Sequence, residues 1–342
     1  MTTHIHVIGY PSELGGANTE LWHTVKLWRK FGVDVTLIPT WKADPKWQRR
    51  LEGIGCRTVH SDPDNLHRVP GLAGSFVVSL CNTKFLAVAE RFQQLDCRIV
   101  WLGCMNWLFP EERLHYRRFG TFDRHVFQSC YQRDRLVPQL VKFGFERANG
   151  RLIRGAFDVG EFPFRPLRRR PGEIFAIGRI SRPAADKFSS RTWKIYGRVP
   201  HPLRARVLGW EAEVRARLGP PPTWAECLPA GSRTPQEFLA TLAAMVHASG
   251  SAVENWPRVG LEAMAAGVPI VTENRGGWAE MIRHGRTGYL CGGEDQLAYY
   301  TARLAYDEDH RQAIARQARR AVEEELADPQ TIWEGWQELL NG

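Results

Sequence analysis

The sequence predicts two α/β domains, each with a doubly wound parallel sheet, facing each other across a cleft. Three observations indicate this fold class: the length of 342 residues, a strand–turn–helix–strand unit at the start, and a second α/β series after a stretch rich in proline and arginine. A chain of this length usually forms two domains of ~150–170 residues, each with its own core. The 43% hydrophobic and 11% aromatic content excludes a disordered or fibrous chain.

The first half opens with the elements of a βαβ unit. Residues 4–9 are an apolar run with β-branched side chains and predict a strand, which ends in a turn that carries Gly15 and Gly16. Apolar residues at helical spacing predict a helix over 19–31, which Gly32 ends, and a second strand is expected at 33–39. Further strands are expected at 75–80, 98–103 and 126–129, and a helix at 132–142.

The stretch 161–172 holds three prolines and four arginines and predicts an interdomain linker. The expected N-terminal domain is 1–165 and the expected C-terminal domain is 172–330, with a helix at 331–342 packing back on the first domain. In the second domain, strands are expected at 173–180, 205–208 and 268–273, and helices at 234–248 and 309–325. The helix at 234 begins with a capping box, Thr234 to Glu237, with proline at its first position.

Composition also indicates the cellular compartment. No apolar run approaches the ~18–20 residues of a membrane span, and residues 1–9 lack the pattern of a signal peptide. Seven cysteines without a Cys-x-x-Cys pair predict free thiols in a reducing compartment. We therefore expect a cytoplasmic protein.

Charge is uneven along the chain. Residues 1–170 carry 26 Lys and Arg against 16 Asp and Glu, whereas residues 171–342 carry 20 against 21. A basic half predicts an anionic partner for that half, whether nucleic acid, a phosphorylated lipid or an acidic glycan.

The densest functional pattern lies between Ser251 and Cys291. Asn255 is the expected N-cap of a helix that contains Pro257 and ends at Gly267. The first turn of such a helix offers free N–H groups and a partial positive charge, which suit a phosphate. Glu254 and Glu262 lie on either side of that turn, and their carboxylates suit the hydroxyls of a ribose and of a sugar ring.

Glu254 and Glu262, which are separated by seven residues and followed by the run 263–269, resemble the donor-site motif of family-4 retaining glycosyltransferases of the GT-B fold. The resemblance is specific at 254–288 and weak at 40–125. It implies a GT-B fold with two Rossmann-like domains, and a retaining, metal-independent enzyme. The supporting segments are 15–16, 154–158, 177–181, 273–280 and 285–290.

The resemblance also implies roles for single residues. Glu262 would hold the ribose hydroxyls of the donor, Glu254 those of the transferred sugar, and Arg179 and Lys187 the diphosphate. The implied catalytic residues are Glu254, Arg179 and Lys187. The implied donor-binding residues are Gly16, Arg179, Lys187, Glu254, Asn255, Arg258, Val259, Gly260 and Glu262.

This chain departs from the family pattern at two adjacent positions. Pro257 stands where glycine is usual and has no N–H to offer a phosphate. Arg258 stands where an aliphatic residue is usual and adds a possible anion contact. The stretch 101–107 has no histidine where the family often has one, so no catalytic residue of the first domain is identified.

The implied donor is a nucleotide-sugar, with a UDP-sugar as the first expectation and GDP or ADP left open. No other cofactor and no metal are expected. The motif Asp62-Pro63-Asp64 has the spelling of a metal-binding aspartate pair but lies among turn-forming residues, which favours a turn.

The acceptor stays open at this point. One alternative is a hydroxyl on a glycan, a lipid or another anionic acceptor bound by the basic N-terminal domain, with membrane association but no membrane span. Another is a hydroxymethylated base in DNA, with the arginines of the first half along the phosphates. A third is a non-catalytic protein that binds a nucleotide-sugar.

Overall fold

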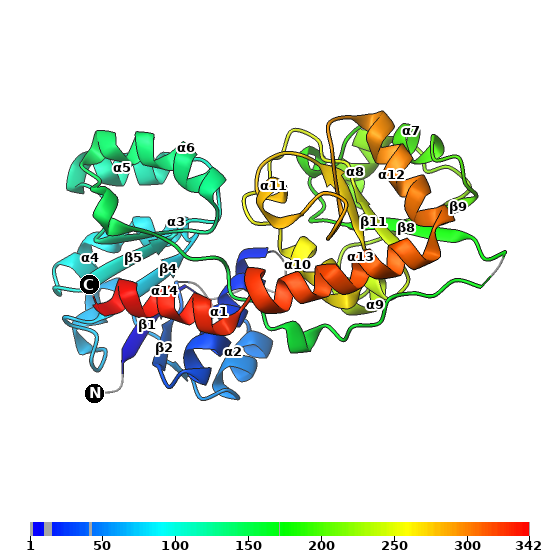
Figure 1. Cartoon of the computed structure of the whole chain (residues 1–342). Helices are drawn as coiled ribbons and strands as arrows, with labels where there is room; N and C mark the ends of the chain where they lie inside the picture. Colours follow the sequence, from blue (N-terminus) through cyan, green and yellow to red (C-terminus); the bar gives the residue numbers. More distant parts are fainter. Residues whose placement is uncertain (1–2, 10–15, 41–42, 171, 342) are drawn as a thin grey trace. The chain divides into compact units, whose positions relative to one another are not determined.

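The computed structural model describes residues 3–9, 16–40, 43–170 and 172–341. The chain forms two compact units: unit 1 is residues 1–157 with 329–342, and unit 2 is residues 158–328 (Figure 1). The division therefore lies before the stretch 161–172, in which the sequence places the linker.

Unit 1 is built on a parallel sheet with the strand order β3-β2-β1-β4-β5-β6-β7. The strands are β1 (His4–Ile8), β2 (Asp34–Ile38), β3 (Arg57–Thr58), β4 (Phe76–Leu80), β5 (Arg98–Leu102), β6 (Arg124–Phe127) and β7 (Gly150–Leu152). The order reverses between β1 and β4, as in a doubly wound sheet. The β1, β2, β4, β5 and β6 strands lie where the sequence predicts strands, because each is a short and mostly buried run.

The helices of unit 1 cover its sheet. They are α1 (Gly16–Lys30), α2 (Pro45–Glu52), α3 (Thr83–Leu86), α4 (Ala89–Gln93), α5 (Pro110–Phe119), α6 (Cys130–Leu140) and α14 (Pro329–Asn341). Single 3-10 turns add η1 (Pro63–Arg68), η2 (Val141–Phe143) and η3 (Arg147–Asn149). Of the turn after β1, Gly16 begins α1, whereas Gly15 lies outside the described residues.

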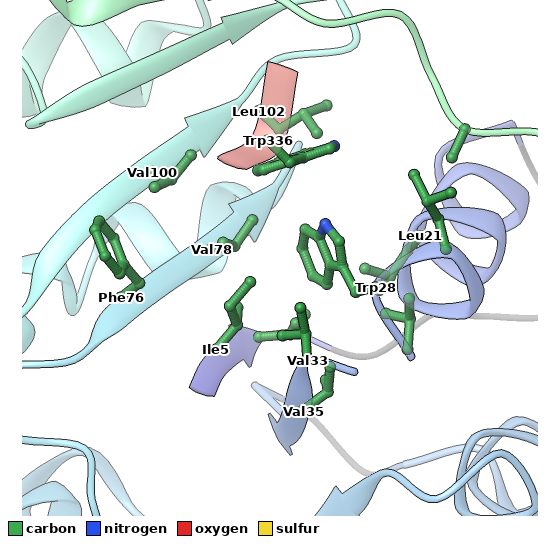
Figure 2. Close-up of a cluster of buried hydrophobic side chains, with 14 of the residues drawn as sticks. Ile5, Leu21, Trp28, Val33, Val35, Phe76, Val78, Val100, Leu102 and Trp336 are labelled. Atoms are coloured by element: carbon green, nitrogen blue, oxygen red, sulfur yellow. The ribbon is translucent and has the colours of Figure 1, made fainter. Parts of the chain in front are cut away.

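The α14 helix belongs to unit 1 although it follows all of unit 2 in the chain. Its Trp336 packs edge-on against Trp28 of α1, with the ring centres 4.8 Å apart. Figure 2 shows both indoles facing Val78, Val100 and Leu102 of the sheet. Both tryptophans are almost fully buried, and each buries ~150–250 Å² of surface, so α14 supplies a substantial part of this core.

Unit 2 repeats the doubly wound plan, with the order β10-β9-β8-β11-β12-β13 and parallel pairing. The strands are β8 (Phe175–Ile180), β9 (Leu203–Leu208), β10 (Ala225–Leu228), β11 (Ala244–His247), β12 (Ile270–Glu273) and β13 (Tyr289–Cys291). The α-helices are α7 (Thr192–Gly197), α8 (Ala212–Leu218), α9 (Pro235–Leu239), α10 (Arg258–Ala266), α11 (Trp278–Met281), α12 (Glu294–Tyr306) and α13 (Glu308–Ala321). Two 3-10 turns, η4 (Val159–Glu161) and η5 (Ala185–Lys187), and a short π-helix, η6 (Val322–Leu326), complete the unit.

The segment 158–170 is held along unit 2. The Arg165 N–H donates to the Ala266 carbonyl (3.1 Å). On α13, Arg319 donates to the Phe162 carbonyl (2.7 Å) and the buried Arg311 to the Leu167 carbonyl (2.8 Å). These bonds fix the segment to unit 2, because they pair its backbone N–H and carbonyl groups with groups of that unit.

The helix predicted over 234–248 is wrong beyond its first turns. The α9 helix ends at Leu239, and residues 244–247 form the central strand β11. The alanine-rich run from Ala243 to Ala248 is buried throughout, and such a run does not distinguish a buried helix from a buried strand. The capping box is confirmed, since the Thr234 hydroxyl accepts from the Glu237 N–H and the Glu237 carboxylate accepts from the Thr234 N–H.

Candidate active site

The β8 strand carries Arg179 next to its carboxyl end, and the side chain is fully buried. Its guanidinium donates to the carbonyls of Ala248 and Lys187, the latter at 2.7 Å, and to the Ser181 hydroxyl at 3.1 Å. It also stacks on Phe188, 4.1 Å from the ring centre. Burial lowers the pKa of Arg179, while Tyr196, Glu254 and Glu273 act in the opposite sense. Arg179 therefore holds the Lys187 backbone in place and adds a buried positive charge next to it.

Lys187 and Glu254 form an ion pair, with 2.8 Å between the ammonium nitrogen and a carboxylate oxygen. Both side chains are about four-fifths buried, so the pair is only partly screened by water. The structure thus brings together the three predicted catalytic residues, Arg179, Lys187 and Glu254. A lysine ammonium beside a carboxylate can bind an anion and a hydroxyl side by side, and the buried Arg179 adds its charge from within the protein.

The backbone at Glu254 and Asn255 is held by two glycines. The Gly277 N–H donates to the Glu254 carbonyl (2.8 Å). A Cβ on Gly277 would lie 1.7 Å from the Asn255 carbonyl oxygen, and one on Gly276, whose φ is +57°, would lie 2.4 Å from that of Glu254. Only glycine fits at either position, because the two backbone segments are in direct contact.

The α10 helix begins at Arg258, and Pro257 occupies the N-cap position with extended backbone. The prediction that Asn255 is the N-cap is wrong. Proline fixes its own φ and disfavours helical backbone in the residue before it, so the N-cap is Pro257, two residues beyond Asn255, and the helix begins at Arg258. The predicted end is confirmed, since Gly267 has the left-handed conformation at φ 86°.

Arg258 and Glu262 lie one turn apart on α10, and both are buried. Burial raises the pKa of Glu262 to about 7, and the Arg258 charge acts in the opposite sense. The Glu262 carboxyl can therefore change its protonation near neutral pH. A buried carboxylate of this kind gains stability from ligand hydroxyls that donate to it.

The next two predicted donor-binding residues, Val259 and Gly260, differ in their exposure to solvent. Val259 is partly exposed, whereas Gly260 is buried. A Cβ on Gly260 would lie 2.4 Å from the Met281 sulfur and 2.7 Å from the Trp278 ring. Gly260 therefore allows α10 and α11 to pack closely. Gly16, in unit 1, is exposed at the start of α1.

Sequence reasoning assigned no role to Glu273 and Arg275. The Glu273 carboxylate accepts from the Ser249 N–H (3.1 Å) and from Arg275 (3.2 Å), and Arg275 donates to the Gly250 carbonyl (2.7 Å). These bonds fix the loop that leads from β11 to Glu254. The signal was present in the sequence, because Glu273 is the last residue of a predicted strand and Arg275 follows it, at the edge where the site lies.

His247 was also missed, since it falls in the run predicted as a helix. It is fully buried at the end of β11, and neither ring nitrogen has a hydrogen-bond partner in the described part of the chain. Its ring lies 5.1 Å from that of Trp278. Burial lowers its pKa well below the ordinary value, and the charges of Arg179, Lys187 and Arg275 act in the same sense.

The charge asymmetry changes when the structural division is used. Unit 1 carries 22 basic and 16 acidic residues, and unit 2 carries 24 and 21. The difference arises because the four arginines between 165 and 170 belong to unit 2, and the acidic residues of α14 belong to unit 1. Both units are thus weakly basic, and the charge argument for an anionic partner of unit 1 weakens.

Two negative findings hold for the described residues only. Within these ranges, no group of three or more His, Cys, Asp or Glu side chains is placed to hold a metal ion. Among the helices described, none is both long enough and apolar enough to cross a bilayer. The seven cysteines all lie in the described ranges, and none of them takes part in a disulfide bond.

Comparison with known proteins finds relatives over part of the chain. Residues 228–321, which include Glu254 and Glu262, match the family model "Glycosyl transferases group 1". The chain is 33% identical over 104 residues to spore coat protein SA of Bacillus subtilis, a match over 30% of this chain and 26% of that protein. It is 37% identical over 81 residues to N-acetyl-alpha-D-glucosaminyl L-malate synthase of Bacillus anthracis, over 23% of this chain and 21% of that protein. The chain thus spans about a quarter of the length of these relatives.

Solved structures resemble the chain over nearly its whole length. HepE of Anabaena, in complex with UDP-glucose, aligns with a TM-score of 0.76 at 19% identity over 99% of both chains. A variant of TarM from S. aureus, in complex with fondaparinux, alpha-GlcNAc-glycerol and UDP, aligns with a TM-score of 0.76 at 10% identity over 100% of both chains. The predicted fold class is confirmed: the chain has the two Rossmann-like α/β domains of the GT-B glycosyltransferases.

Proposed function

We propose that the protein is a glycosyltransferase that takes a sugar from a nucleotide-sugar held by unit 2 and transfers it to a hydroxyl of an acceptor held by unit 1. The observation that carries this proposal is the cluster of Arg179, Lys187 and Glu254 beside the start of α10, with Glu262 in the same helix. The match of residues 228–321 to a glycosyltransferase family model supports it.

Each side chain has a role that its chemistry allows. The Lys187 ammonium binds the donor diphosphate. Arg179 holds the Lys187 backbone in place and adds a positive charge next to it. Lys187 is paired with Glu254 in the free protein. When Lys187 binds the diphosphate instead, the Glu254 carboxylate can accept hydrogen bonds from the hydroxyls of the sugar. The Glu262 carboxylate accepts from the ribose hydroxyls. Arg258 adds a cation at the helix start, where Pro257 offers no N–H.

We further propose that the reaction retains the configuration of the anomeric carbon and uses no metal. The bond between the anomeric carbon and the diphosphate oxygen breaks, and the bond to the acceptor oxygen forms on the same face. The acceptor proton passes to a diphosphate oxygen. Lys187 and Arg179 stabilise the negative charge that develops on the leaving diphosphate.

UDP is the proposed nucleotide, in line with the UDP and UDP-glucose complexes of proteins with this fold. The proposed acceptor is a glycan hydroxyl, free or carried by a lipid. Since both units are weakly basic, the charge distribution gives no separate support to a DNA acceptor.

Donor hydrolysis tests the proposal without a known acceptor, because water can take the acceptor's place. The protein is incubated with UDP-glucose, UDP-galactose, UDP-N-acetylglucosamine and GDP-mannose, and the first anomer released is identified by proton NMR. We expect one donor to be cleaved with retention. Release of the inverted anomer would contradict the mechanism, and cleavage of no donor together with no affinity for UDP or GDP would contradict the function.

The Glu254→Gln variant tests the site. Its turnover should fall by roughly 10²–10³-fold, with the affinity for UDP nearly unchanged, since the carboxylate contacts the sugar and not the nucleotide. Glu325→Gln is the matched control, because Glu325 forms an exposed ion pair with Arg283 in the same unit. Turnover of Glu254→Gln equal to that of the control would rule out the role of Glu254.

A further inference from the structure

Two cysteines of unit 1 follow the ends of the neighbouring strands β4 and β5, which lie side by side in Figure 1. Leu80 and Leu102, the last residues of these strands, are partners in the parallel register. Cys81 comes directly after β4, and its N–H donates to the Leu102 carbonyl (2.9 Å). Cys104 comes after β5 and one glycine. Because neighbouring strands lie ~4.8 Å apart, this register favours a Cα separation within the roughly 4.4–6.8 Å that a disulfide requires.

The two cysteines are in direct contact. The Cys81 sulfur accepts a hydrogen bond from the Cys104 N–H (3.4 Å), and the Cys104 thiol donates to it as well. Cys81 also has left-handed backbone, with φ at 49°. Residues with a side chain rarely adopt this conformation, and where they do the surrounding structure imposes it, often at functional sites. The fold therefore holds the Cys81 side chain against Cys104 in an unusual backbone conformation.

Cys81 has the surroundings of a reactive thiol. The hydrogen bond from the Cys104 thiol lowers the pKa of Cys81, and the N–H groups of Cys104 and Met105 act in the same sense, against burial and the charge of Glu112. By contrast, burial raises the pKa of other thiols to about 11 (Cys56, Cys97 and Cys227) or about 12 (Cys291). The thiolate is the form that attacks an oxidant. Because Cys81 and Cys104 are only half-buried, a small oxidant can reach them.

The two loops that carry these cysteines are anchored to different parts of unit 1. The buried Asn82, next to Cys81, is the N-cap of α3 and donates to the carbonyl at the end of β1 (3.4 Å). Gln132 of α6 donates to the carbonyls of the residues on either side of Cys104 (2.7 Å each). Both thiols are thus positioned by hydrogen bonds of their own loops. A bond between the two sulfurs would join the loop after β4 to the loop that α6 holds.

We propose that Cys81 and Cys104 form a reversible oxidation site, which closes to an intramolecular disulfide on reaction with hydrogen peroxide. The Cys81 thiolate attacks one peroxide oxygen, the O–O bond breaks, and Cys81 becomes a sulfenic acid while the other oxygen leaves as water. The Cys104 thiol then attacks the sulfenic sulfur, and the S–S bond forms with release of a second water. Two thiols are oxidised and one peroxide is reduced. A dithiol reductant reverses the reaction, and the inference does not depend on the proposed function.

Mass spectrometry on the full chain tests this inference, because trypsin leaves the two cysteines in separate peptides, 69–84 and 99–113. The reduced protein is treated with equimolar hydrogen peroxide at pH 8, the remaining thiols are alkylated, and the digest is analysed without reduction. The two peptides should appear linked, with a mass two hydrogen atoms below their sum, and dithiothreitol should separate them. Cys81 should lose its thiol at least about tenfold faster than Cys227.

Two variants make the test specific. Cys104→Ser keeps a hydrogen-bond donor beside Cys81 but removes the second thiol, so it should form no link and should leave a sulfenic acid at Cys81 that dimedone traps. The matched control is Cys130→Ser, at the first position of α6 and two residues before Gln132, which should form the link as the wild type does. The inference is wrong if peroxide leaves Cys81 as a thiol, if Cys227 reacts equally fast, or if Cys81 becomes linked to a cysteine other than Cys104. A link that forms in urea but not in the folded protein would contradict it equally.

Discussion

At the residue scale, the candidate site depends on ionisable groups that the fold holds away from water. Glu254 is already paired with Lys187 at 2.8 Å, whereas Glu262 is buried with a pKa raised to about 7. The first carboxylate already has a cationic partner in the absence of ligand. The second changes its charge within the physiological range, and this difference makes Glu262 the group whose titration a donor would sense.

Donor affinity should therefore depend on pH through Glu262. The folded protein binds a proton at Glu262 below about pH 7, and only the charged form accepts ribose hydroxyls at both oxygens. Affinity for UDP-glucose, whose diphosphate has no proton to lose in this range, should rise from pH 6 to about pH 8 and level off above that. Calorimetric titration measures it. Glu262→Gln should bind weakly at every pH, and a pH profile in that variant parallel to the wild type would assign the dependence to another group.

Buried histidines should make the fold sensitive to acid. Burial lowers the pKa of His125 to about 3 and is the main cause of the lowered pKa of His6, about 4. The unfolded chain, with histidine near 6.5, therefore takes up protons first as the pH falls, and the free energy of unfolding decreases below about pH 6.5. Each of the two histidines should cost about 2 kcal/mol between pH 7.5 and 5.

Urea denaturation at pH 7.5 and 5.0 measures this loss. His125→Leu should lose about 2 kcal/mol less than the wild type over the same interval, because its side chain does not titrate. An equal loss in both proteins would show that His125 does not contribute.

At the element scale, the turn before α11 decides the shape of the site. Gly276 and Gly277 contact the backbone of Glu254 and Asn255 so closely that no side chain fits. Two loops that follow different strands are thereby locked together. The position of the Glu254 carboxylate thus depends on residues more than twenty positions later in the chain.

Gly277→Ala should displace the Glu254 backbone, because the new Cβ would lie 1.7 Å from the Asn255 carbonyl oxygen. We expect a loss of about 2 kcal/mol or more in the stability of unit 2, and at least a tenfold weaker affinity for UDP. Thermal unfolding and calorimetry measure the two effects. Gly197→Ala is the control, since its Cβ would meet only Trp224, at an ordinary 3.8 Å. Equal behaviour of the two variants would mean that the loop contact is unimportant.

The elements that the sequence predicted well are those with a strong local signal. The β1–α1–β2 unit and the Thr234 capping box depend on neighbouring residues alone. The β11 strand was missed because alanine and methionine suit a buried helix as well as a buried strand, and only its pairing with β8 and β12 decides. His247, which lies in this strand, was therefore missed as a site residue as well. The Lys187–Glu254 pair was expected only through resemblance, since nothing local brings residues 67 positions apart together.

At the scale of the whole molecule, the distribution of charge and the path of the chain both differ from what the order of residues along the sequence predicts. Residues 165–170 carry four arginines that the sequence assigned to the first half, yet they belong to unit 2. The α14 helix returns to unit 1. The net charge of one half of the sequence is therefore not the net charge of one unit. Only the contacts show which unit each segment stabilises.

Trp336→Ala should destabilise unit 1 and leave unit 2 intact. Removing an indole packed against Trp28 opens a cavity in the core, which should cost about 3–5 kcal/mol. Proteolysis followed by mass spectrometry should show earlier cleavage within 1–157, with UDP affinity unchanged. Trp107→Ala, at a half-exposed tryptophan, is the control. A loss of UDP affinity in Trp336→Ala alone would show that the two units depend on each other energetically.

The return of α14 has a consequence for synthesis. Unit 1 lacks one wall of its core until α14 has been made, and α14 follows the entire sequence of unit 2. At translation rates of roughly 5–20 residues per second, the nascent unit 1 waits about 10–30 s for that helix. During this interval, the surface later covered by Trp333 and Trp336 is open to chaperones and to other nascent chains, while unit 2 can already complete its fold.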